Sequence, residues 1–163
     1  MLRIREAMDV APLSPTQKPG PTDVLIRPAR AEDGRVLVRL LDLLGYPGSE
    51  PFIQARIREL GQREDDHLLV AEVGGQAKAF ISLHFIPQLA LAGDFARISY
   101  LCVDQDSQGM GIGKLLLARA EELARERGCD RMEVHSALRR EGAHQFYDAL
   151  GYFDSPKYLI KKL

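Results

Sequence analysis

The sequence has little of what binds metals, spans membranes or carries a strong charge of one sign. Its two cysteines, Cys102 and Cys129, form no C-x-x-C pair, and no His/Cys cluster predicts a zinc site. We expect free thiols in a reducing compartment. No apolar run approaches the roughly 20 residues of a membrane span, and the N-terminus lacks a signal-peptide core. A formal net charge of -1 argues against nucleic acid or lipid as a partner. These absences predict a cytoplasmic protein without a metal.

The chain of 163 residues is long enough for one domain with an ordinary core. Residues 1–22 are rich in proline and polar residues, which predicts an extended arm outside the core. Residues 23–163 are expected to form the single domain. Apolar periodicity and turn residues give that domain the order β-α-α-β-β-β-α-β-α-β. This order predicts an α/β fold, a mixed sheet with helices on both faces. The expected strands are 24–27, 67–73, 77–86, 95–103, 132–135 and 158–160, and the expected helices are 32–44, 50–63, 114–127 and 142–150.

The most informative segment is the glycine-rich stretch that joins the strand ending at Val103 to the helix beginning near Lys114. Its residues are Gln108, Gly109, Met110, Gly111, Ile112 and Gly113. Such a turn leaves backbone N–H groups unpaired at the helix N-terminus, where the helix dipole also favours an anion. Glycines allow a ligand to approach the backbone closely. The segment therefore predicts a site for a phosphate-bearing cofactor.

Three phosphate-binding patterns can be compared with this stretch. The P-loop pattern fails because Leu115 follows Lys114 where a hydroxyl residue is required. The dinucleotide pattern G-x-G-x-x-G matches at Gly109 and Gly111 but meets Lys114 at its third glycine. The pattern Q/R-x-x-G-x-G/A after L-x-V matches throughout. A glycine turn that only starts a helix is the remaining alternative.

The third pattern resembles the acetyl-coenzyme A loop of the GNAT N-acetyltransferase superfamily. Two further segments resemble it in the expected order: Ile26-Arg27-Pro28-Ala29 at the start, and Phe146-Tyr147-Asp148-Ala149-Leu150-Gly151-Tyr152 near the end. Residues 82–84, 139–144 and 158–163 are similar to small bacterial aminoalkylphosphonate and aminoglycoside 6′-N-acetyltransferases. The resemblance implies a GNAT-like fold and direct acetyl transfer to a primary amine of a small molecule.

The resemblance also implies how acetyl-coenzyme A would be held. The backbone from Gly109 to Lys114 would bind the pyrophosphate, with a side-chain donor from Gln108. The backbone of Leu101 and Val103 would pair with the pantetheine arm, and an N–H of Leu101 or Cys102 would polarise the acetyl carbonyl. The cofactor-binding residues are thus expected to be Leu101, Cys102, Val103, Gln108, Gly109, Met110, Gly111, Ile112, Gly113, Lys114 and Phe146.

Tyr147 is the expected general acid, because a phenol stays protonated at neutral pH and can donate to a departing thiolate. The alternative is an amphipathic ring packed in the core. Many relatives place a carboxylate base just ahead of L-x-V, where this chain has Ser99 and Tyr100. Glu72, His84 and His144 stay open as the base, directly or through a water. Each has a second interpretation as an exposed, half-buried or helix-capping side chain.

Substrate and assembly are less constrained by the sequence. If two of Arg97, Arg139, Arg140 and Lys157 converge, they suit an acceptor with a phosphonate or carboxylate; otherwise they are solvated surface charges. Sheet-edge dimers are common among the proteins that the chain resembles, so a homodimer is one expected state. A non-catalytic acyl-coenzyme A-binding or regulatory module on the same fold is the competing function.

Overall fold

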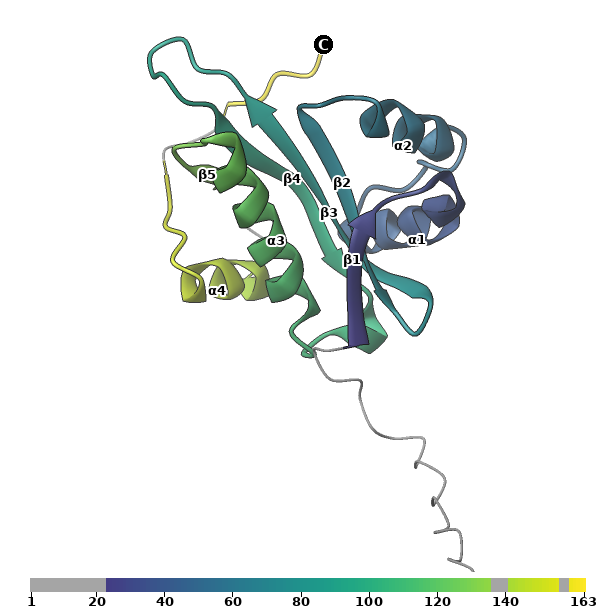
Figure 1. Cartoon of the computed structure of the whole chain (residues 1–163). Helices are drawn as coiled ribbons and strands as arrows, with labels where there is room; N and C mark the ends of the chain where they lie inside the picture. Colours follow the sequence, from purple (N-terminus) through teal and green to yellow (C-terminus); the bar gives the residue numbers. More distant parts are fainter. Residues whose placement is uncertain (1–22, 136–140, 156–158) are drawn as a thin grey trace, which may run out of the picture.

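The structure, a computed structural model, describes residues 23–135, 141–155 and 159–163, so the predicted N-terminal arm lies outside the described residues (Figure 1). Five strands and four α-helices follow the predicted order as far as residue 149. Their bounds are β1 Val24–Pro28, α1 Gly34–Leu44, α2 Ile53–Gly61, β2 Asp66–Val73, β3 Gln76–Ile86, β4 Phe95–Val103, α3 Ile112–Arg127, β5 Met132–Val134 and α4 Glu141–Ala149. Two 3₁₀ turns, η2 (Ala31–Asp33) and η3 (Gln105–Ser107), precede α1 and follow β4.

The strands lie in chain order from β1 to β5 in one mixed sheet. The first four strands are antiparallel to their neighbours, whereas β5 runs parallel to β4. A parallel pair requires a crossover, and α3 supplies it. The expected α/β fold with a mixed sheet is confirmed.

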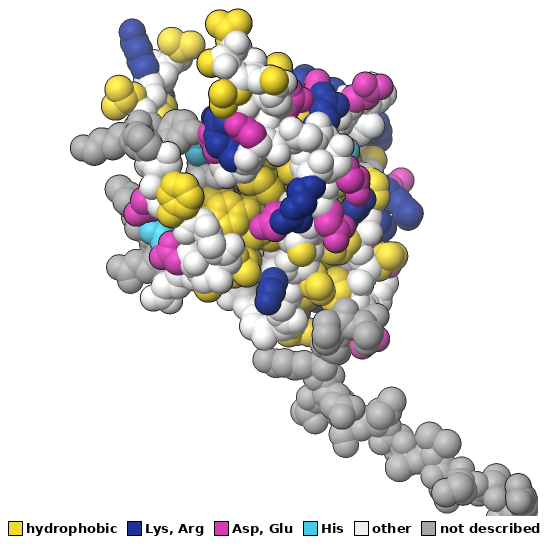
Figure 2. Space-filling model, turned by 60° about the vertical axis from the view of Figure 1, so that its left-hand side comes forward, with side chains coloured by type: hydrophobic (Ala, Val, Ile, Leu, Met, Phe, Trp, Pro, Cys, Tyr) yellow, Lys and Arg dark blue, Asp and Glu magenta, His cyan; other side chains and the backbone are white. Residues whose placement is uncertain are grey.

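Two helical layers sandwich the sheet, with α1 and α2 on one face and α3 and α4 on the other (Figure 1). Successive side chains of β2 point to opposite faces of the sheet and so belong to two different cores. Leu69 and Ala71 pack in the core under α3, whereas Val70 between them packs under α1 and α2. The face that carries α3 and α4 also shows an apolar area in its middle, rimmed by charged side chains (Figure 2).

Helix α3 begins two residues earlier than expected, at Ile112. It buries Leu116, Leu117, Ala120 and Ala124, residues on one side of a 3.6-residue period. Helix α2 is shorter than the expected range 50–63, and Phe52, inside that range, is 53% exposed. Phe52 occupies the position before the first helical residue, so the helical period does not fix its direction.

The last strand, expected at residues 158–160, is not borne out where it can be seen. Tyr158 lies outside the described residues, and Leu159 and Ile160 have no strand conformation and are 94% and 90% exposed. A strand requires a hydrogen-bonding neighbour, and the described register of the sheet ends at β5.

Among the described residues, no helix is long and apolar enough to cross a membrane. The same residues contain no group of three or more His, Cys, Asp or Glu side chains placed to hold a metal ion.

Candidate functional site

The glycine-rich loop forms an open N-terminus for α3. Gly109 and Gly111 have φ angles of 75° and 78°, and Gly111 is the N-cap residue, with no side-chain cap on the helix. The N–H of Leu115 donates to the carbonyl of Gly111, at 3.1 Å. The N–H groups of the preceding helical turn therefore have no partner within the helix and are available to a ligand.

Space at the loop fits a bound diphosphate. A Cβ added to Gly109 or Gly111 would meet nothing within 4 Å, so the ligand side of the loop is open. A Cβ on Gly113 would stand 3.4 Å from Cγ2 of Val103 and 3.6 Å from Cζ of Phe146. The loop is thus open toward solvent and closed by β4 and α4 behind it, which suits close approach of an anion to the backbone.

Ion pairs hold the end of β4 from which this loop starts. Asp104 is 4% exposed and accepts two hydrogen bonds from the Arg39 guanidinium of α1, at 2.8 and 2.6 Å. These bonds hold the pKa of the Asp104 carboxyl below its usual value. Lys78 of β3 donates to Asp106 at 3.0 Å. The loop therefore begins from a fixed position.

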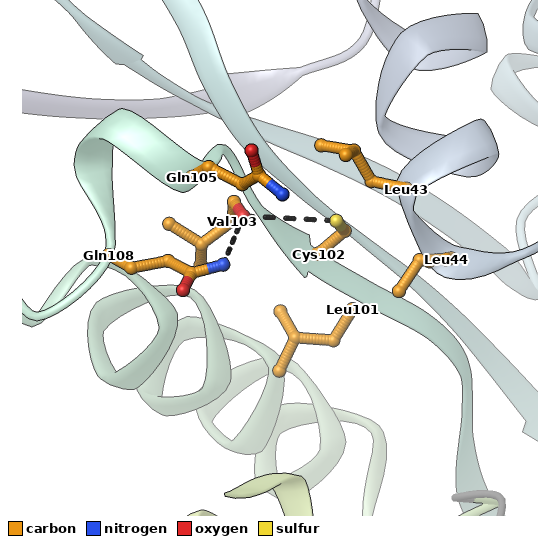
Figure 3. Close-up of a pocket in the computed structure, with 7 residues that line it drawn as sticks. All are labelled: Leu43, Leu44, Leu101, Cys102, Val103, Gln105 and Gln108. Atoms are coloured by element: carbon orange, nitrogen blue, oxygen red, sulfur yellow. Dashed lines mark hydrogen bonds between the residues drawn. The ribbon is translucent and has the colours of Figure 1, made fainter. Parts of the chain in front are cut away.

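A pocket of about 250 Å³ lies between the C-terminal end of α1 and the end of β4 (Figure 3). The Gln108 side chain turns back over its rim and donates to the carbonyl of Val103 at 3.3 Å. The Cys102 side chain packs in the core under α1 and lies at the pocket beside Leu43 and Leu44 (Figure 3). The pocket is lined by Leu43, Leu44, Leu101, Cys102, Val103, Gln105 and Gln108.

Beside this pocket, β4 separates from β5 after Ile98, and we call this point the fork. In the described part of the chain β5 pairs with Ala96–Ile98 of β4 and with no later residue of that strand. A bulge falls at the same point, because Tyr100 pairs with Ser82, Ile98 pairs with Leu83, and Ser99 has no cross-strand partner. The end of β4 therefore presents backbone on the side away from β3, as an added strand would require.

The two expected aromatic residues of α4 lie on the α3 side of this fork. Tyr147 is 8% exposed and belongs to the core under α3. Its ring makes edge contacts with Phe146 and Tyr152, with centroids 5.2 and 5.4 Å away. The Tyr152 hydroxyl donates to Glu121 of α3 at 3.3 Å, and burial raises the pKa of this phenol above its usual value. Phe146 thus adjoins the glycine loop at Gly113, and Tyr147 contacts Phe146.

His84 of β3 is bonded on both ring nitrogens. Nδ1 lies 2.5 Å from Oδ1 of Asp66 on β2, and Nε2 contacts the hydroxyl of Ser99 on β4. The Ser82 hydroxyl is 3.3 Å from the same Nε2. His84 is 27% exposed, whereas the Asp66 side chain is 8% exposed and also pairs with Arg63. This places a histidine next to the residues that precede L-x-V.

The other two candidate bases lie apart from the fork. Glu72 accepts a hydrogen bond from Arg27 at 2.7 Å, and the same guanidinium donates to both oxygens of Asp33 at 2.8 and 2.9 Å. Glu72 is thus part of an ion-pair cluster at the β1–β2 edge. His144 is half-buried on α4, next to Phe146 in the chain.

The proposed anion-binding group is only partly within the described structure. Arg97 pairs with Glu133 of β5 at 3.1 Å. Arg139, Arg140 and Lys157 lie outside the described residues.

The sequence alone did not indicate that Asp66, Ser82 and Ser99 contact His84. Asp66 opens β2 and comes next to His84 through the register of two antiparallel strands, eighteen positions apart in the chain. Ser99 comes next to His84 through the bulge. The pattern of charged and apolar residues does not predict either contact with His84, because strand register and bulges depend on the whole sheet.

Comparison with known sequences gives one family and two partial relatives. The family described as Acetyltransferase (GNAT) family matches residues 37–152. An aminoalkylphosphonate N-acetyltransferase of Salmonella typhimurium is 37% identical over 89 residues, which cover 55% of this chain and 58% of that protein. An uncharacterised N-acetyltransferase of Methanocaldococcus jannaschii is 33% identical over 95 residues, which cover 57% of this chain and 42% of that protein. The chain thus spans about half the length of these relatives.

Solved structures share the fold over nearly their full length. A transcriptional regulator from Bacillus halodurans has a TM-score of 0.78 and 29% identity, covering 86% of this chain and 99% of that one. An aminoglycoside acetyltransferase from an uncultured soil metagenomic sample has a TM-score of 0.72 and 19% identity, covering 88% and 98%. The second likeness is one of fold alone.

Proposed function

Because this chain belongs to the GNAT acetyltransferase family, whose members typically use an acyl-coenzyme A, we propose that it transfers an acetyl group from acetyl-coenzyme A to a primary amine of a small molecule. The single observation that carries the proposal is the glycine loop opening α3 beside a fork between β4 and β5. Acetyl-coenzyme A supplies the activated acyl group as a thioester. The residues of this chain bind it, orient it and move protons.

The backbone of Gly109 to Lys114 holds the diphosphate, aided by Gln108 and by the unpaired N–H groups of the first turn of α3. Ile112 contributes through its backbone, since its side chain is 1% exposed and packs in the core. We call this diphosphate-binding loop, Gly109 to Lys114, the cradle. Met110 lies within it, and Phe146 lies beside it. The pocket at the end of β4 receives the pantetheine arm along Leu101 to Val103.

At the fork, the N–H of Leu101 or Cys102 polarises the acetyl carbonyl. Tyr147 protonates the leaving thiolate from the α3 side of the sheet. Its ring is fixed between Phe146 and Tyr152, which lowers the entropic cost of presenting its hydroxyl.

His84 is the base that the geometry favours over Glu72 and His144. It lies on the opposite face of the sheet from Tyr147 and contacts the residue at the fork, Ser99. Glu72 is held by Arg27 two strands from β4. We therefore assign proton removal to the His84 side of the sheet and protonation of the thiolate to the Tyr147 side.

A small amine with an anionic group is the acceptor class to test first. This rests on the partial similarity to aminoalkylphosphonate N-acetyltransferase. Aminoglycosides form the second class. Thiol release should be measured with acetyl-coenzyme A and a panel of aminoalkylphosphonates, aminoglycosides and amino-terminal peptides. Release that depends on one amine class would support the proposal.

Two matched variants test the acid. Tyr147→Phe should lower kcat by about 10²-fold with little change in the KM for acetyl-coenzyme A. Tyr152→Phe removes the same atom from a neighbouring ring that is bonded to Glu121 instead, so it should leave kcat unchanged. Equal loss in both variants would contradict the assignment of Tyr147.

The competing function is a non-catalytic acyl-coenzyme A-binding or regulatory module. The similarity to a protein described as a transcriptional regulator favours it. Tight binding of coenzyme A without turnover on any amine would support this alternative. Stabilisation by NAD and not by coenzyme A in a thermal-shift assay would instead favour a dinucleotide site.

A further inference from the structure

Four side chains form a continuous bonded line across the sheet. Arg63, just after α2, pairs with Asp66 on β2; Asp66 pairs with His84 on β3; and His84 contacts Ser99 on β4. The line ends at the fork where β4 leaves β5. Its inner members are shielded, with Asp66 at 8% side-chain exposure and His84 at 27%.

The chemistry of these groups fixes the direction of each hydrogen bond. A carboxylate only accepts, so His84 carries a proton on Nδ1 and donates it to Asp66. Arg63 pairs with the other Asp66 oxygen and orients this carboxylate. In the neutral ring Nε2 is then an acceptor with one lone pair, which the closer hydroxyl, that of Ser99, occupies; the Ser82 hydroxyl lies 3.3 Å away.

The bulge in β4 explains why Ser99 reaches His84. As the extra residue between Ile98 and Tyr100, Ser99 has no cross-strand partner that fixes its direction. Bulges commonly redirect a side chain next to an active site. The nearest cation on β4, Arg97, is the cross-strand partner of His84 and is paired with Glu133.

We propose that Ser99, His84 and Asp66 form a proton relay in which the Ser99 hydroxyl, and not the imidazole itself, touches the acceptor amine. This inference rests on the proposed function. The bound ammonium gives one proton to Ser99 Oγ while the Ser99 proton passes to Nε2 of His84. The products are a neutral amine, an unchanged serine and an imidazolium facing Asp66. The imidazolium later returns its proton through Ser99 to solvent, and no covalent bond to the protein forms.

In this relay Asp66 is a positioning residue, because it acts through the histidine. It selects the tautomer that leaves Nε2 free to accept, and it stabilises the imidazolium. The relay also explains how this chain can work without a carboxylate ahead of L-x-V. The Ser99 hydroxyl stands at that position and connects it to the more distant base, His84.

Kinetics of matched variants give the first test. Ser99→Ala and Asp66→Asn should each lower kcat by about 10²-fold or more, with the KM for acetyl-coenzyme A little changed. Ser99→Thr keeps a hydroxyl and should restore most of the activity. Ser49→Ala, at a buried serine on the connection between α1 and α2, and Asp33→Asn, which breaks the buried pair with Arg27, should leave kcat unchanged.

Nitrogen-15 NMR of the histidine rings gives a second test that needs no turnover. The His84 ring, assigned with His84→Gln, should show a protonated Nδ1 and an unprotonated Nε2, and Asp66→Asn should abolish that preference. Ser99→Ala should preserve it, since the pair with Asp66 remains.

The outcomes separate this inference from the proposed function. Turnover that is normal in Ser99→Ala overturns the relay and leaves acetyl transfer standing. An Nε2–H tautomer in the wild type overturns it whether or not any amine is acetylated. Mass spectrometry after addition of acetyl-coenzyme A should find Ser99 unmodified; an acetylated Ser99 would make it a nucleophile and refute the relay.

Discussion

Substitution of Gly111 tests the phosphate cradle most directly, because this residue has both a left-handed backbone and open space above it. Its φ is 78°, and an added Cβ would meet no atom within 4 Å. In Gly111→Ala the left-handed conformation costs about 1–2 kcal/mol. For a domain of this size, that cost lowers Tm by about 2–8 °C.

The same methyl group should interfere with the cofactor. It occupies space that the protein leaves open, so a diphosphate cannot come as close to the backbone N–H groups. Loss of one charge-assisted hydrogen bond is worth about 1.5–3 kcal/mol. Binding of coenzyme A, measured by isothermal titration calorimetry, should therefore weaken by about 10- to 150-fold.

Substitutions at two other glycines serve as controls that distinguish the effect of backbone strain from the effect of lost ligand contact. Gly128 ends α3 with a φ of 80° and equally open space, so Gly128→Ala should lower Tm similarly without weakening coenzyme A binding. Gly113→Ala directs its Cβ toward Val103 at 3.4 Å and should have a small effect on both. Wild-type affinity in Gly111→Ala, or equal loss in Gly128→Ala, would refute the cradle.

Three further predictions concern the scaffold. Arg27→Met breaks a shielded ion-pair cluster and should cost about 3–5 kcal/mol in urea unfolding, whereas Glu72→Gln should leave kcat unchanged if that carboxylate is structural. The pKa values of Asp33 and Asp104 are lowered in the folded state, by hydrogen bonds from Arg27 and from α1 respectively. Their stabilisation is thus complete above the usual value of 3.8 and is lost as pH falls through the lowered pKa, so Asp→Asn at both sites should flatten the acid limb of a Tm–pH curve. Leu116→Ala, at a fully buried position of α3, should cost about 2–5 kcal/mol in the same unfolding assay.

Local sequence signals predicted much of this fold because they act over short distances. Apolar runs and turn residues predicted strands at 67–73 and 77–86, which the structure shows as β2 and β3, and the periodicity after Lys114 predicted α3. The glycine spacing around Gly111 predicted an open helix N-terminus. Each of these depends on residues that are neighbours in the chain.

Features that depend on distant partners were beyond these signals. The end strand at 158–160 looks apolar enough, yet Leu159 and Ile160 have no strand conformation, because a strand also needs an edge to pair with. The sequence left Glu72 open as a catalytic base, because its partner Arg27 is 45 positions away in the chain. The fold places the two side chains in hydrogen-bond contact. Asp66 likewise reaches His84 only through strand register.

The bulge at Ser99 connects the cofactor site with the proton relay. Before it, Ala96 and Ile98 pack in the core under α3; after it, Leu101 and Val103 pack there, while Tyr100 and Cys102 pack under α1. Strict alternation from Ile98 would place Leu101 and Val103 under α1 instead. By absorbing this extra residue, the bulge keeps Val103 beneath Gly113 at the cradle and leaves Ser99 against His84 at the fork. Deletion of Ser99 removes the extra residue, so strict alternation from Ile98 would still place Leu101 and Val103 on the α3 face. Turnover should therefore be lost with the Ser99 hydroxyl, whereas coenzyme A binding should be retained.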